Sequence, residues 1–418
     1  MGIWTRLRMP QGAGIAPHRR LSGEAGLTIT IHSLFQFGAS MAGLFLNLYL
    51  WRLTESLYIN GIYNMINYIM TPVGFAIGGW IAKRQDRLVT YRLGIVMTAA
   101  FFLLVVFSRE AVAEYYELFA FLNGLSAGFY WIGYLVLMYD VTTDANRDRY
   151  LGLNMAFFSA AGLAGPALAG AIIGYSPGLQ GYAITFSTAS VMFVIAAVLS
   201  LRVRSVKTRH RKYFLNLMPL LMRKNKVWVK ALYGFFVFGL FQGVMLFLPS
   251  ILLYRTVGRE DLVGYLGAFF SAVVIATGYV MSRKANEHGT ARYVLIAASL
   301  VSAAAFALLI DMNLWTVILF MTAFSISNPL MLNTLNSYYY RLIGTLPLKE
   351  QIRNEVVVMR ETFLNGGRIL SIVLLVFVAK DLESSMLPLV LLGTGLVQFG
   401  VYVFVSARAA GASRTEAS

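Results

Sequence analysis

The sequence of 418 residues contains no cysteine and few charged residues. Without cysteine the chain has no disulfides, no thiolate metal sites and no cysteine nucleophile. Charged residues make up 13% of the chain and hydrophobic residues 58%, with a mean hydropathy of +0.66. A soluble domain carries about 25% charged residues, and a disordered chain has a low content of apolar side chains. The composition therefore indicates an integral membrane protein.

The motifs of common catalytic classes are missing as well. The sequence contains no Gly-x-x-x-x-Gly-Lys-(Ser/Thr) loop, the phosphate-binding motif that would indicate ATP hydrolysis. None of the four histidines forms a His-Glu-x-x-His pair. The stretch Gly124–Gly128 matches Gly-x-Ser-x-Gly, but it lies in an apolar helix with no histidine nearby in sequence. Small-residue helix packing explains it better, as it does the Gly-x-x-x-Gly pairs Gly74/Gly78, Gly170/Gly174 and Gly239/Gly243. We predict no enzyme activity, no metal site and no cofactor.

Twelve stretches are long and apolar enough to cross a membrane as helices, which takes about 20 residues each. They are residues 27–51, 58–82, 89–107, 115–139, 151–174, 181–202, 229–254, 261–282, 292–311, 314–340, 357–379 and 386–406. Residues 1–26 are too polar and too interrupted by glycine and proline for a signal peptide. We interpret them as a short cytoplasmic arm.

The basic residues alternate strongly along the chain. Of the 35 Lys and Arg, 29 fall in segments that share a side with the N-terminus, 5 fall in the intervening loops, and Arg368 lies in a span. Cytoplasmic loops of membrane proteins carry the excess of Lys and Arg. The net charge of +16 is therefore interpreted as a topology signal rather than as a nucleic-acid site. We predict a multi-pass protein of the bacterial plasma membrane with both termini in the cytoplasm.

The two halves of the chain repeat each other weakly. Phe37-Gly38 recurs as Phe238-Gly239, and Leu153-Asn154 recurs as Leu364-Asn365, at offsets of about 200 residues. Shared order and offset favour a duplicated six-helix unit, a common plan in transporters. We predict an N-terminal half at 27–204, a basic cytoplasmic linker at 205–228, a C-terminal half at 229–406 and a cytoplasmic tail at 407–418.

This plan resembles the major facilitator superfamily over about residues 27–406. The family's loop between spans 2 and 3 reads Gly-x-x-x-Asp-(Arg/Lys)-x-Gly-(Arg/Lys). Gly79, Arg84 and Arg87 match it, whereas Lys83 replaces the Asp and Asp86 replaces the second Gly. The resemblance implies a gating loop at Gly79, Arg84, Asp86 and Arg87, with Asp86 as a candidate replacement for the missing acid. Its signature motifs are thus degraded, as in an uncharacterised bacterial branch.

Span 5 carries Gly165-Pro166-Ala167-Leu168-Ala169-Gly170, which is similar to the Gly-Pro-x-x-Gly-Gly motif of exporter-type branches, with Ala169 in place of one glycine. The resemblance favours efflux as the direction of transport. A monomer is the expectation for the family.

Polar side chains at helical spacing mark one face of several spans. Such groups are costly in hydrocarbon and face a partner or a water-filled cavity. Spans 1, 4, 7 and 10 face the central cavity in the family that the chain resembles; interhelical hydrogen bonds, worth about 1 kcal/mol each, are the alternative. The candidate cavity residues are Gln36, Asn60, Asn64, Asn67, Asn123, Ser126, Tyr130, Trp131, Tyr134, Gln242, Met245, Asn328, Asn333 and Asn336.

Span 11 carries the sharpest cluster of charges. Glu361, Asn365 and Arg368 lie at i, i+4 and i+7 on one helix face, directly after Arg360. One hypothesis makes Glu361 the proton-coupling acid and Arg368 its partner, reached through Asn365, or a contact for a substrate anion. The alternative is a structural charge network joined to Asp140, Asp148 or Arg149, and His32 is a further group that titrates near neutral pH.

These patterns predict a secondary active transporter that works by alternating access and exports an amphipathic small organic molecule, with proton coupling as one energy source. The predicted partners are that small molecule and the lipid bilayer, and no nucleic acid. Two alternatives remain open: a lipid or lipid-linked-molecule flippase on the same scaffold, and a non-transporting membrane sensor or scaffold.

Overall fold

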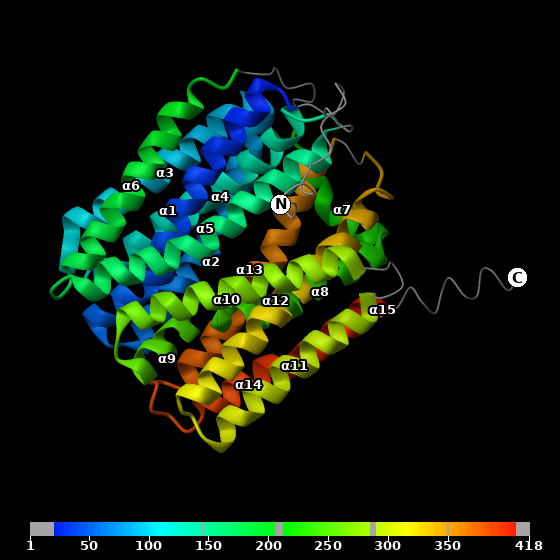
Figure 1. Ribbon diagram of the computed structural model, residues 1–418. Helices are drawn as coiled ribbons and strands as arrows, with labels where there is room; N and C mark the ends of the chain where they lie inside the picture. Colours follow the sequence, from blue (N-terminus) through cyan, green and yellow to red (C-terminus); the bar gives the residue numbers. More distant parts are fainter. Residues whose placement is uncertain (1–20, 144–145, 205–211, 285–289, 349–350, 407–418) are drawn as a thin grey trace, which may run out of the picture.

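The computed structural model describes residues 21–143, 146–204, 212–284, 290–348 and 351–406. Within these ranges, twelve helical segments are long and apolar enough to cross a membrane. The predicted all-α membrane fold is therefore confirmed (Figure 1). The segments begin or end within several residues of the predicted spans; for example, the first begins at Gly23, inside the arm predicted at 1–26.

The first six spans form the N-terminal half: α1 (Gly23–Thr54), α2 (Leu57–Arg84), α3 (Arg87–Ser108), α4 (Tyr116–Asp140), α5 (Arg147–Tyr175) and α6 (Gln180–Ser200). The C-terminal half holds α8 (Lys226–Met245), α9 (Leu248–Val257), α10 (Glu260–Lys284), α11 (Thr290–Ile310), α12 (Leu314–Ile343), α13 (Arg353–Val378), α14 (Leu387–Val397) and α15 (Phe399–Ser406). A short helix, α7 (Met218–Lys224), lies between the halves in sequence.

Two spans of the C-terminal half are interrupted helices. Span 7 consists of α8 and α9, separated at Leu246 and Phe247, and Pro249 follows at the start of α9. Proline fits the first turn of a new helix because its missing N–H has no intrahelical partner there. Span 12 consists of α14 and α15, which meet at the buried Gln398. Irregular backbone at membrane depth is tolerated where protein surrounds it.

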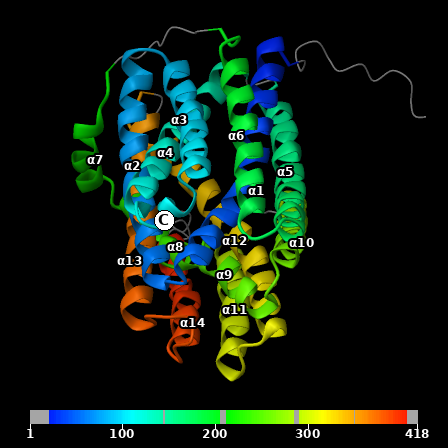
Figure 2. The same ribbon diagram turned by 90° about the vertical axis from the view of Figure 1, so that its left-hand side faces the viewer.

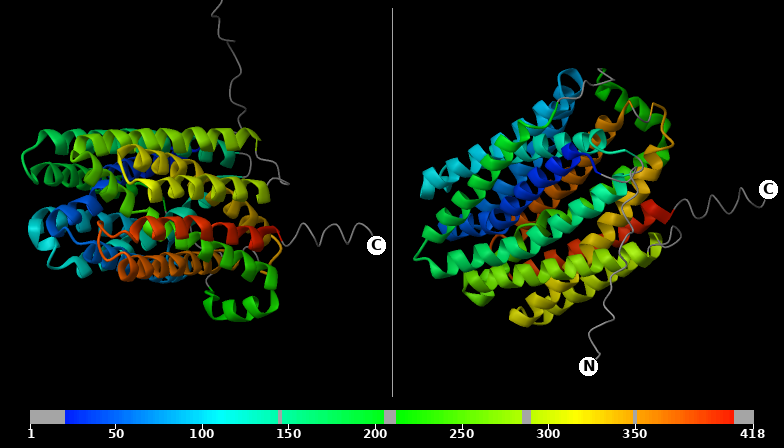
Figure 3. Two further views of the ribbon diagram at one scale, coloured as in Figure 1. Left: turned by 90° about the horizontal axis from the view of Figure 1, so that it is seen from below. Right: turned by 45° about the horizontal axis from the view of Figure 1, so that its top comes forward.

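The two halves lie side by side and contact each other mainly through α2 with α13 and α5 with α10, and also through α1 with α9. They converge at the lower left of Figure 1 and diverge toward the upper right, and two further views show the same division (Figure 3). We call the end at which α1 begins and α2 ends the basic end, because Lys83, Arg84 and Arg353 lie there. The opposite end holds Arg52 and Glu260.

Glycines set the close approach of helices at the pivot between the halves. A side chain at Gly170 of α5 would place its Cβ 2.7 Å from the Cα of Gly264 on α10. Within the N-terminal half, a Cβ on Gly128 of α4 would lie 2.6 Å from the Cα of Gly74 on α2. Small residues let membrane helices pack at this distance. The prediction that Gly124–Gly128 is a packing motif is confirmed at Gly128.

The linker between the halves packs against the basic end of the bundle. Its residues 205–211 lie outside the described part of the chain, whereas residues 212–214 run past the end of α2. The helix α7 stands at the edge of the bundle, outside the ring of spanning helices (Figure 2). Its last turn carries Arg223 and Lys224, as expected for a segment near an anionic surface.

Candidate functional site

A large cavity lies between the two halves. Its volume is about 1250 Å³, and its walls come from α1, α2, α4 and α5 on one side and from α8, α12 and α13 on the other. The lining runs from Lys83 and Arg353 at the basic end to Asn67 and Arg368 near the middle of their spans. Ligand pockets for drug-sized molecules measure about 300–1,000 Å³. The cavity is therefore large enough for a small organic molecule with room to spare.

The opposite end of the molecule is closed by contacts between the halves. Arg52 at the end of α1 donates from Nη1 to the Tyr254 hydroxyl on α9 at 2.6 Å, and its Nε lies 3.3 Å from Oε1 of Glu260 on α10. The guanidinium also lies 5.4 Å from the centre of the Tyr254 ring. The two halves thus contact each other at this end, and the residues that line the cavity extend to the basic end.

One wall of the cavity centres on Arg368 of α13. Its Nε and Nη2 donate to Oε1 of Gln242 on α8, at 3.2 and 2.6 Å, and its Nη1 donates to Oδ1 of Asn365 at 3.1 Å. Gln242 in turn donates to Oδ1 of Asn328 on α12 at 2.9 Å. The Arg368 guanidinium lies 5.1 Å from the centre of the Tyr68 ring on α2, a cation–π contact across the two halves.

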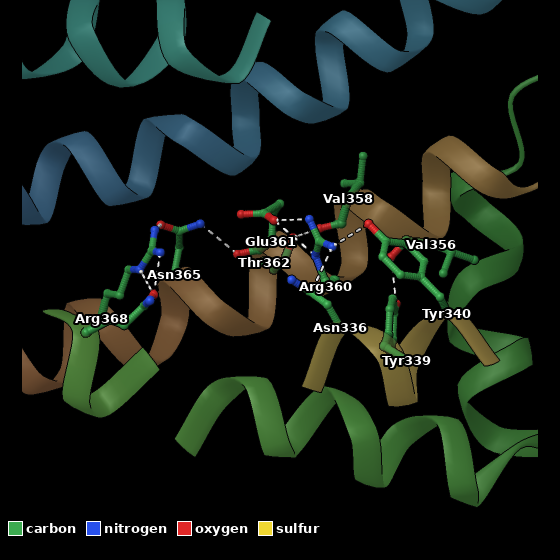
Figure 4. A network of polar contacts seen from close by, with 11 residues as sticks. Asn336, Tyr339, Tyr340, Val356, Val358, Arg360, Glu361, Thr362, Asn365 and Arg368 are labelled. Atoms are coloured by element: carbon green, nitrogen blue, oxygen red, sulfur yellow. Dashed lines mark hydrogen bonds and ion pairs between the residues drawn. The ribbon is translucent and has the colours of Figure 1, made fainter. Parts of the chain in front are cut away.

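A second cluster on the same wall holds a buried ion pair (Figure 4). Nη2 of Arg360 lies 2.7 Å from Oε1 of Glu361, and Nη1 of Arg360 donates to Asn336 and to the Tyr340 hydroxyl, each at 3.3 Å. The Tyr339 hydroxyl donates to the backbone oxygen of Val356 at 2.8 Å. Burying a charge requires such pairing, so Arg360 and Glu361 satisfy each other.

The predicted link between Glu361 and Arg368 takes a different form. Asn365 does lie between them, donating to the backbone oxygen of Glu361 at 2.8 Å and accepting from Arg368 (Figure 4). The Glu361 carboxylate, however, pairs with Arg360 instead. Residues that are adjacent in a helix point about 100° apart. The long side chain of Arg360 nevertheless folds back onto Glu361 and pairs with its carboxylate. Asn365 therefore links Arg368 to the backbone of Glu361, whereas the Glu361 carboxylate belongs to the Arg360 cluster.

The other wall, from the N-terminal half, is aromatic and apolar. His32 on α1 stacks on Tyr134 of α4 with the ring centres 3.9 Å apart, and its Nδ1 lies 2.5 Å from the Tyr130 hydroxyl. Trp131 meets Tyr134 edge-on at 6.0 Å. Near the basic end the wall continues with Ile132, Leu135, Val136, Met138, Leu151, Met155 and Phe158. This surface suits the apolar body of a ligand.

A smaller cavity of about 240 Å³ opens within the N-terminal half, and it shares Asn67, Tyr68, Asn123 and Trp131 with the large one. Asn64, Ser126 and Tyr130 line only this smaller space. Asn123 donates to the Tyr63 hydroxyl at 3.1 Å, and Asn64 donates to Asn47 at 2.8 Å. Their amides therefore serve interhelical hydrogen bonds and the cavity wall at once.

The predicted cavity residues thus divide into two groups. Those that line one or both cavities are Asn64, Asn67, Asn123, Ser126, Tyr130, Trp131, Tyr134, Gln242 and Asn336. The others are Gln36, which contacts the ring of His32; Asn60 and Met245, which are buried between helices; Asn328, behind Gln242; and Asn333, which is exposed. Helical spacing cannot separate these groups, because a polar face also forms where two helices hydrogen-bond.

The comparison with known protein families decides the identity of the fold. The model of the Major Facilitator Superfamily matches residues 28–372. The chain belongs to this superfamily. It is accordingly a multi-pass membrane protein of transporter type, and not an enzyme.

One relative of this facilitator superfamily member matches most of the chain, and another matches a little over a third of it. A Bacillus subtilis (strain 168) protein, "Uncharacterized protein YqgE", is 30% identical over 378 residues, covering 90% of this chain and 88% of the relative. A Geobacillus stearothermophilus protein, "Uncharacterized protein in sodM 3'region", is 33% identical over 160 residues, covering 38% of this chain and 75% of the relative.

Solved transporter structures share the fold at low sequence identity. A structure of proton-dependent oligopeptide transporters matches with a TM-score of 0.71 at 12% identity, covering 94% of this chain and 99% of the other. The nucleoside transporter NupG matches with a TM-score of 0.69 at 11% identity, covering 91% and 99%. At these identities the likeness concerns the fold.

The departure from the superfamily's loop motif has a structural counterpart. Lys83, which stands where the motif has Asp, is buried and pairs with Glu355 of α13 at 2.5 Å. Lys83 also donates to the backbone oxygens of Lys212 and Gln351, and Glu355 accepts from the backbone N–H of Phe214 at 2.8 Å. Lys83 on α2 and Glu355 on α13 therefore form a charge pair that joins the two halves.

The remaining residues of the predicted gating loop support local structure. Asp86 caps α3 by accepting from the N–H of Leu88 at 3.0 Å, so it does not replace the missing acid. The Arg84 guanidinium lies 4.8 Å from the centre of the Trp80 ring. A Cβ on Gly79 would lie 3.3 Å from the hydroxyl of Tyr213, so the linker packs directly on this glycine.

Some predicted residues cannot be placed. The side chains of Arg87, Asp140 and Asp148 lie outside the described part of the chain, whereas Arg149 lies in α5 near the basic end.

The sequence patterns did not predict Tyr68, Asn154 and the pair of Lys83 with Glu355 as parts of the site. Tyr68 directly follows Asn67 but lies about 100° around α2 from it, so the i, i+4, i+7 pattern passes over it.

Proposed function

We propose that this protein is a secondary active transporter that works by alternating access and exports an amphipathic small organic molecule. The observation that carries the proposal is the cavity of about 1250 Å³ between the halves, closed at the Arg52 end and walled by aromatic residues facing polar ones. The exporter-like sequence Gly165–Gly170 supports the direction. In the described structure it packs α5 against α1 and α10, at the pivot between the halves.

We propose further that a monomer acts in the bacterial plasma membrane with both termini in the cytoplasm. The distribution of basic residues supports this orientation, because Lys and Arg favour cytoplasmic loops. In that orientation the basic end is cytoplasmic, and the cavity accepts its solute from inside the cell.

Flux across proteoliposomes tests the transport function. Three naphthyl probes with a poor passive permeability serve: a sulfonate, a quaternary ammonium and a neutral glycoside. We expect protein-dependent flux of at least one probe. Flux no faster than through liposomes with an unrelated membrane protein, for all three probes, would count against a transporter of amphipathic molecules.

The flippase alternative uses the same vesicles with a fluorescent phospholipid in place of the soluble probe. Protein-dependent movement of the lipid between leaflets, with no flux of the soluble probes, favours the flippase. The sensor or scaffold alternative moves neither. The wide apolar wall from Ile132 to Phe158 is the feature that keeps the lipid alternative in view.

Proton coupling is tested at Glu361. Protonation of its carboxylate would break the 2.7 Å pair with Arg360 and release a cation in the cavity wall. In inverted vesicles with a pH gradient, Glu361→Gln is expected to abolish the proton dependence of flux. Glu383→Gln, at an exposed ion pair with Arg255, serves as the matched control. If Glu361→Gln retains the proton dependence, Glu361 is not the coupling acid.

A further inference from the structure

Arg368 differs from Lys83 and Arg360, two other basic residues of the cavity wall, in its partners. Lys83 pairs with Glu355 and Arg360 pairs with Glu361, whereas Arg368 forms no ion pair within the described residues. In the described part of the chain, its guanidinium contacts the amide oxygens of Gln242 and Asn365 and the Tyr68 ring. A cation deep in a membrane span needs a partner or water.

The hydrogen bonds of Arg368 leave part of its guanidinium available. Arginine has five N–H donors, and the three hydrogen bonds to Gln242 and Asn365 use one on Nε, one on Nη1 and one on Nη2. One N–H therefore remains on each of the two terminal nitrogens. A carboxylate, sulfonate or phosphate accepts charge-assisted hydrogen bonds from such donors.

The neighbouring side chains fix this donor pair in place. Gln242 accepts two hydrogen bonds from one edge of the guanidinium, and Asn328 holds Gln242 from behind. The Tyr68 ring covers one face at 5.1 Å. A guanidinium that is held in this way loses little conformational entropy when an anion binds.

The charge of the whole cavity favours an anion as well. Its described lining includes four basic side chains and one acidic one, namely Lys83, Arg353, Arg360 and Arg368 against Glu361, and Glu355 behind the lining neutralises Lys83. All except Lys83 lie on α13. The facing wall of His32, Trp131 and Tyr134 supplies an aromatic surface without a carboxylate among its described residues. Cationic side chains and aromatic rings thus lie on opposite sides of one space.

We infer that the solute of this transporter is an amphipathic organic anion, whose acid group binds Arg368 while its apolar body packs against Trp131 and Tyr134. The inference rests on the proposed transport function but is tested separately, by binding. The ligand class is a carboxylate, sulfonate or phosphate monoester attached to an aromatic or aliphatic body.

Calorimetric titration of the purified full chain with 2-naphthalenesulfonate tests the inference directly. We expect the wild-type protein to bind the sulfonate at least about 10-fold more tightly than the matched naphthyl quaternary ammonium. Arg368→Gln is expected to weaken sulfonate binding about 10- to 100-fold and to leave the ammonium unaffected, since a hydrogen bond to a charged group carries that share of affinity. Arg223→Gln, on the exposed helix α7, is the charge-matched control and is expected to bind like the wild type.

Two further variants keep the test decisive if Arg368→Gln folds poorly. Arg368→Lys retains the charge and is expected to keep part of the affinity, because an ammonium cannot form the paired hydrogen bonds. Gln242→Glu places a carboxylate within hydrogen-bond distance of Arg368 and is expected to abolish sulfonate binding while Arg368 stays in place. Equal binding of sulfonate and ammonium, or full affinity in Gln242→Glu, would overturn the inference.

The outcomes also separate this inference from the transport function. Binding that depends on Arg368 without any flux would support the anion site and overturn the transporter. Flux of the ammonium or glycoside with no sulfonate binding would support the transporter and overturn the anion site.

Discussion

The pair of Lys83 with Glu355 is the residue-scale contact that joins the halves at the basic end. The carboxylate of Glu355 is fully buried, and one of its oxygens binds Lys83 and the N–H of Phe214. Its other oxygen, Oε2, has no hydrogen-bond partner among the residues that the structure describes. The Lys83 ammonium also lies 5.5 Å from the centre of the Phe214 ring. Burial and the negative charge of Glu355 raise the pKa of the Tyr213 hydroxyl, which therefore stays a neutral donor to the backbone oxygen of Ala76.

Removing one member of this pair should be costly. Glu355→Gln leaves the buried Lys83 ammonium without a counter-charge, and the loss of one partner of a buried pair costs about 3–5 kcal/mol. We expect a clear drop in thermal unfolding temperature in detergent. Glu383→Gln, which breaks the exposed pair with Arg255, should cost less than about 1 kcal/mol. Equal destabilisation by the two variants would contradict the structural role of the Lys83 pair.

The sequence could suggest candidates at this scale but could not assign their partners. Span 11 was recognisable from the sequence, because Arg360, Glu361 and Arg368 are charged residues within a predicted span. The partner of each charge depends on tertiary packing. Arg368 hydrogen-bonds Gln242, which is 126 positions away in the sequence, and Lys83 pairs with Glu355, which is 272 positions away. Nothing in the local sequence encodes these contacts, and the motif comparison pointed to Asp86, which caps α3 instead.

At the scale of elements, the contact between α5 and α10 defines where the halves meet. The backbone of Gly170 approaches that of Gly264 so closely that even one methyl group has no room. Farther along the same helix, a Cβ on Gly152 would have nothing within 4 Å. One helix thus provides both a crowded glycine and an open one.

This difference predicts opposite effects of the same substitution. Gly170→Ala should destabilise the protein by roughly 1–3 kcal/mol, because the backbones must move apart to accept the methyl group. Gly152→Ala should be neutral or stabilise the helix by up to about 1 kcal/mol. Thermal unfolding of both variants in one detergent checks the pair. A Gly170→Ala variant as stable as Gly152→Ala would place the pivot elsewhere.

Elements were the scale at which the sequence was most informative. Apolar length and the alternation of basic loops predicted the twelve spans, because a segment that crosses lipid must be long and apolar and must satisfy its backbone hydrogen bonds within the protein. The helix breaks at Leu246 and Gln398 were not predicted, since their flanking residues remain apolar and keep the hydropathy high. Only Pro249 gave a local signal for the first of them.

At the scale of the whole molecule, an anionic solute makes transport sensitive to the membrane potential. Moving one charge through 100 mV changes the free energy by about 2.3 kcal/mol. With an inside-negative potential, export of an organic anion is favourable without a coupling ion. In proteoliposomes with a potassium diffusion potential, we expect naphthalenesulfonate to move toward the positive side and to reverse with the sign of the potential. If the flux does not change with the membrane potential, the transport cycle moves no net charge, and a second ion compensates the charge of the sulfonate.

The absence of native cysteine allows the central claim to be tested in an otherwise natural chain. Thr143 and Thr345 are exposed just beyond α4 and α12, on the two sides of the cavity at the basic end. The measurement is probe flux through proteoliposomes that contain Thr143→Cys/Thr345→Cys, before and after bridging with a thiol cross-linker and after its cleavage. Alternating access predicts that flux falls to background when the mouth is bridged, returns on cleavage, and is unchanged in either single variant. Full flux through the bridged protein would contradict it.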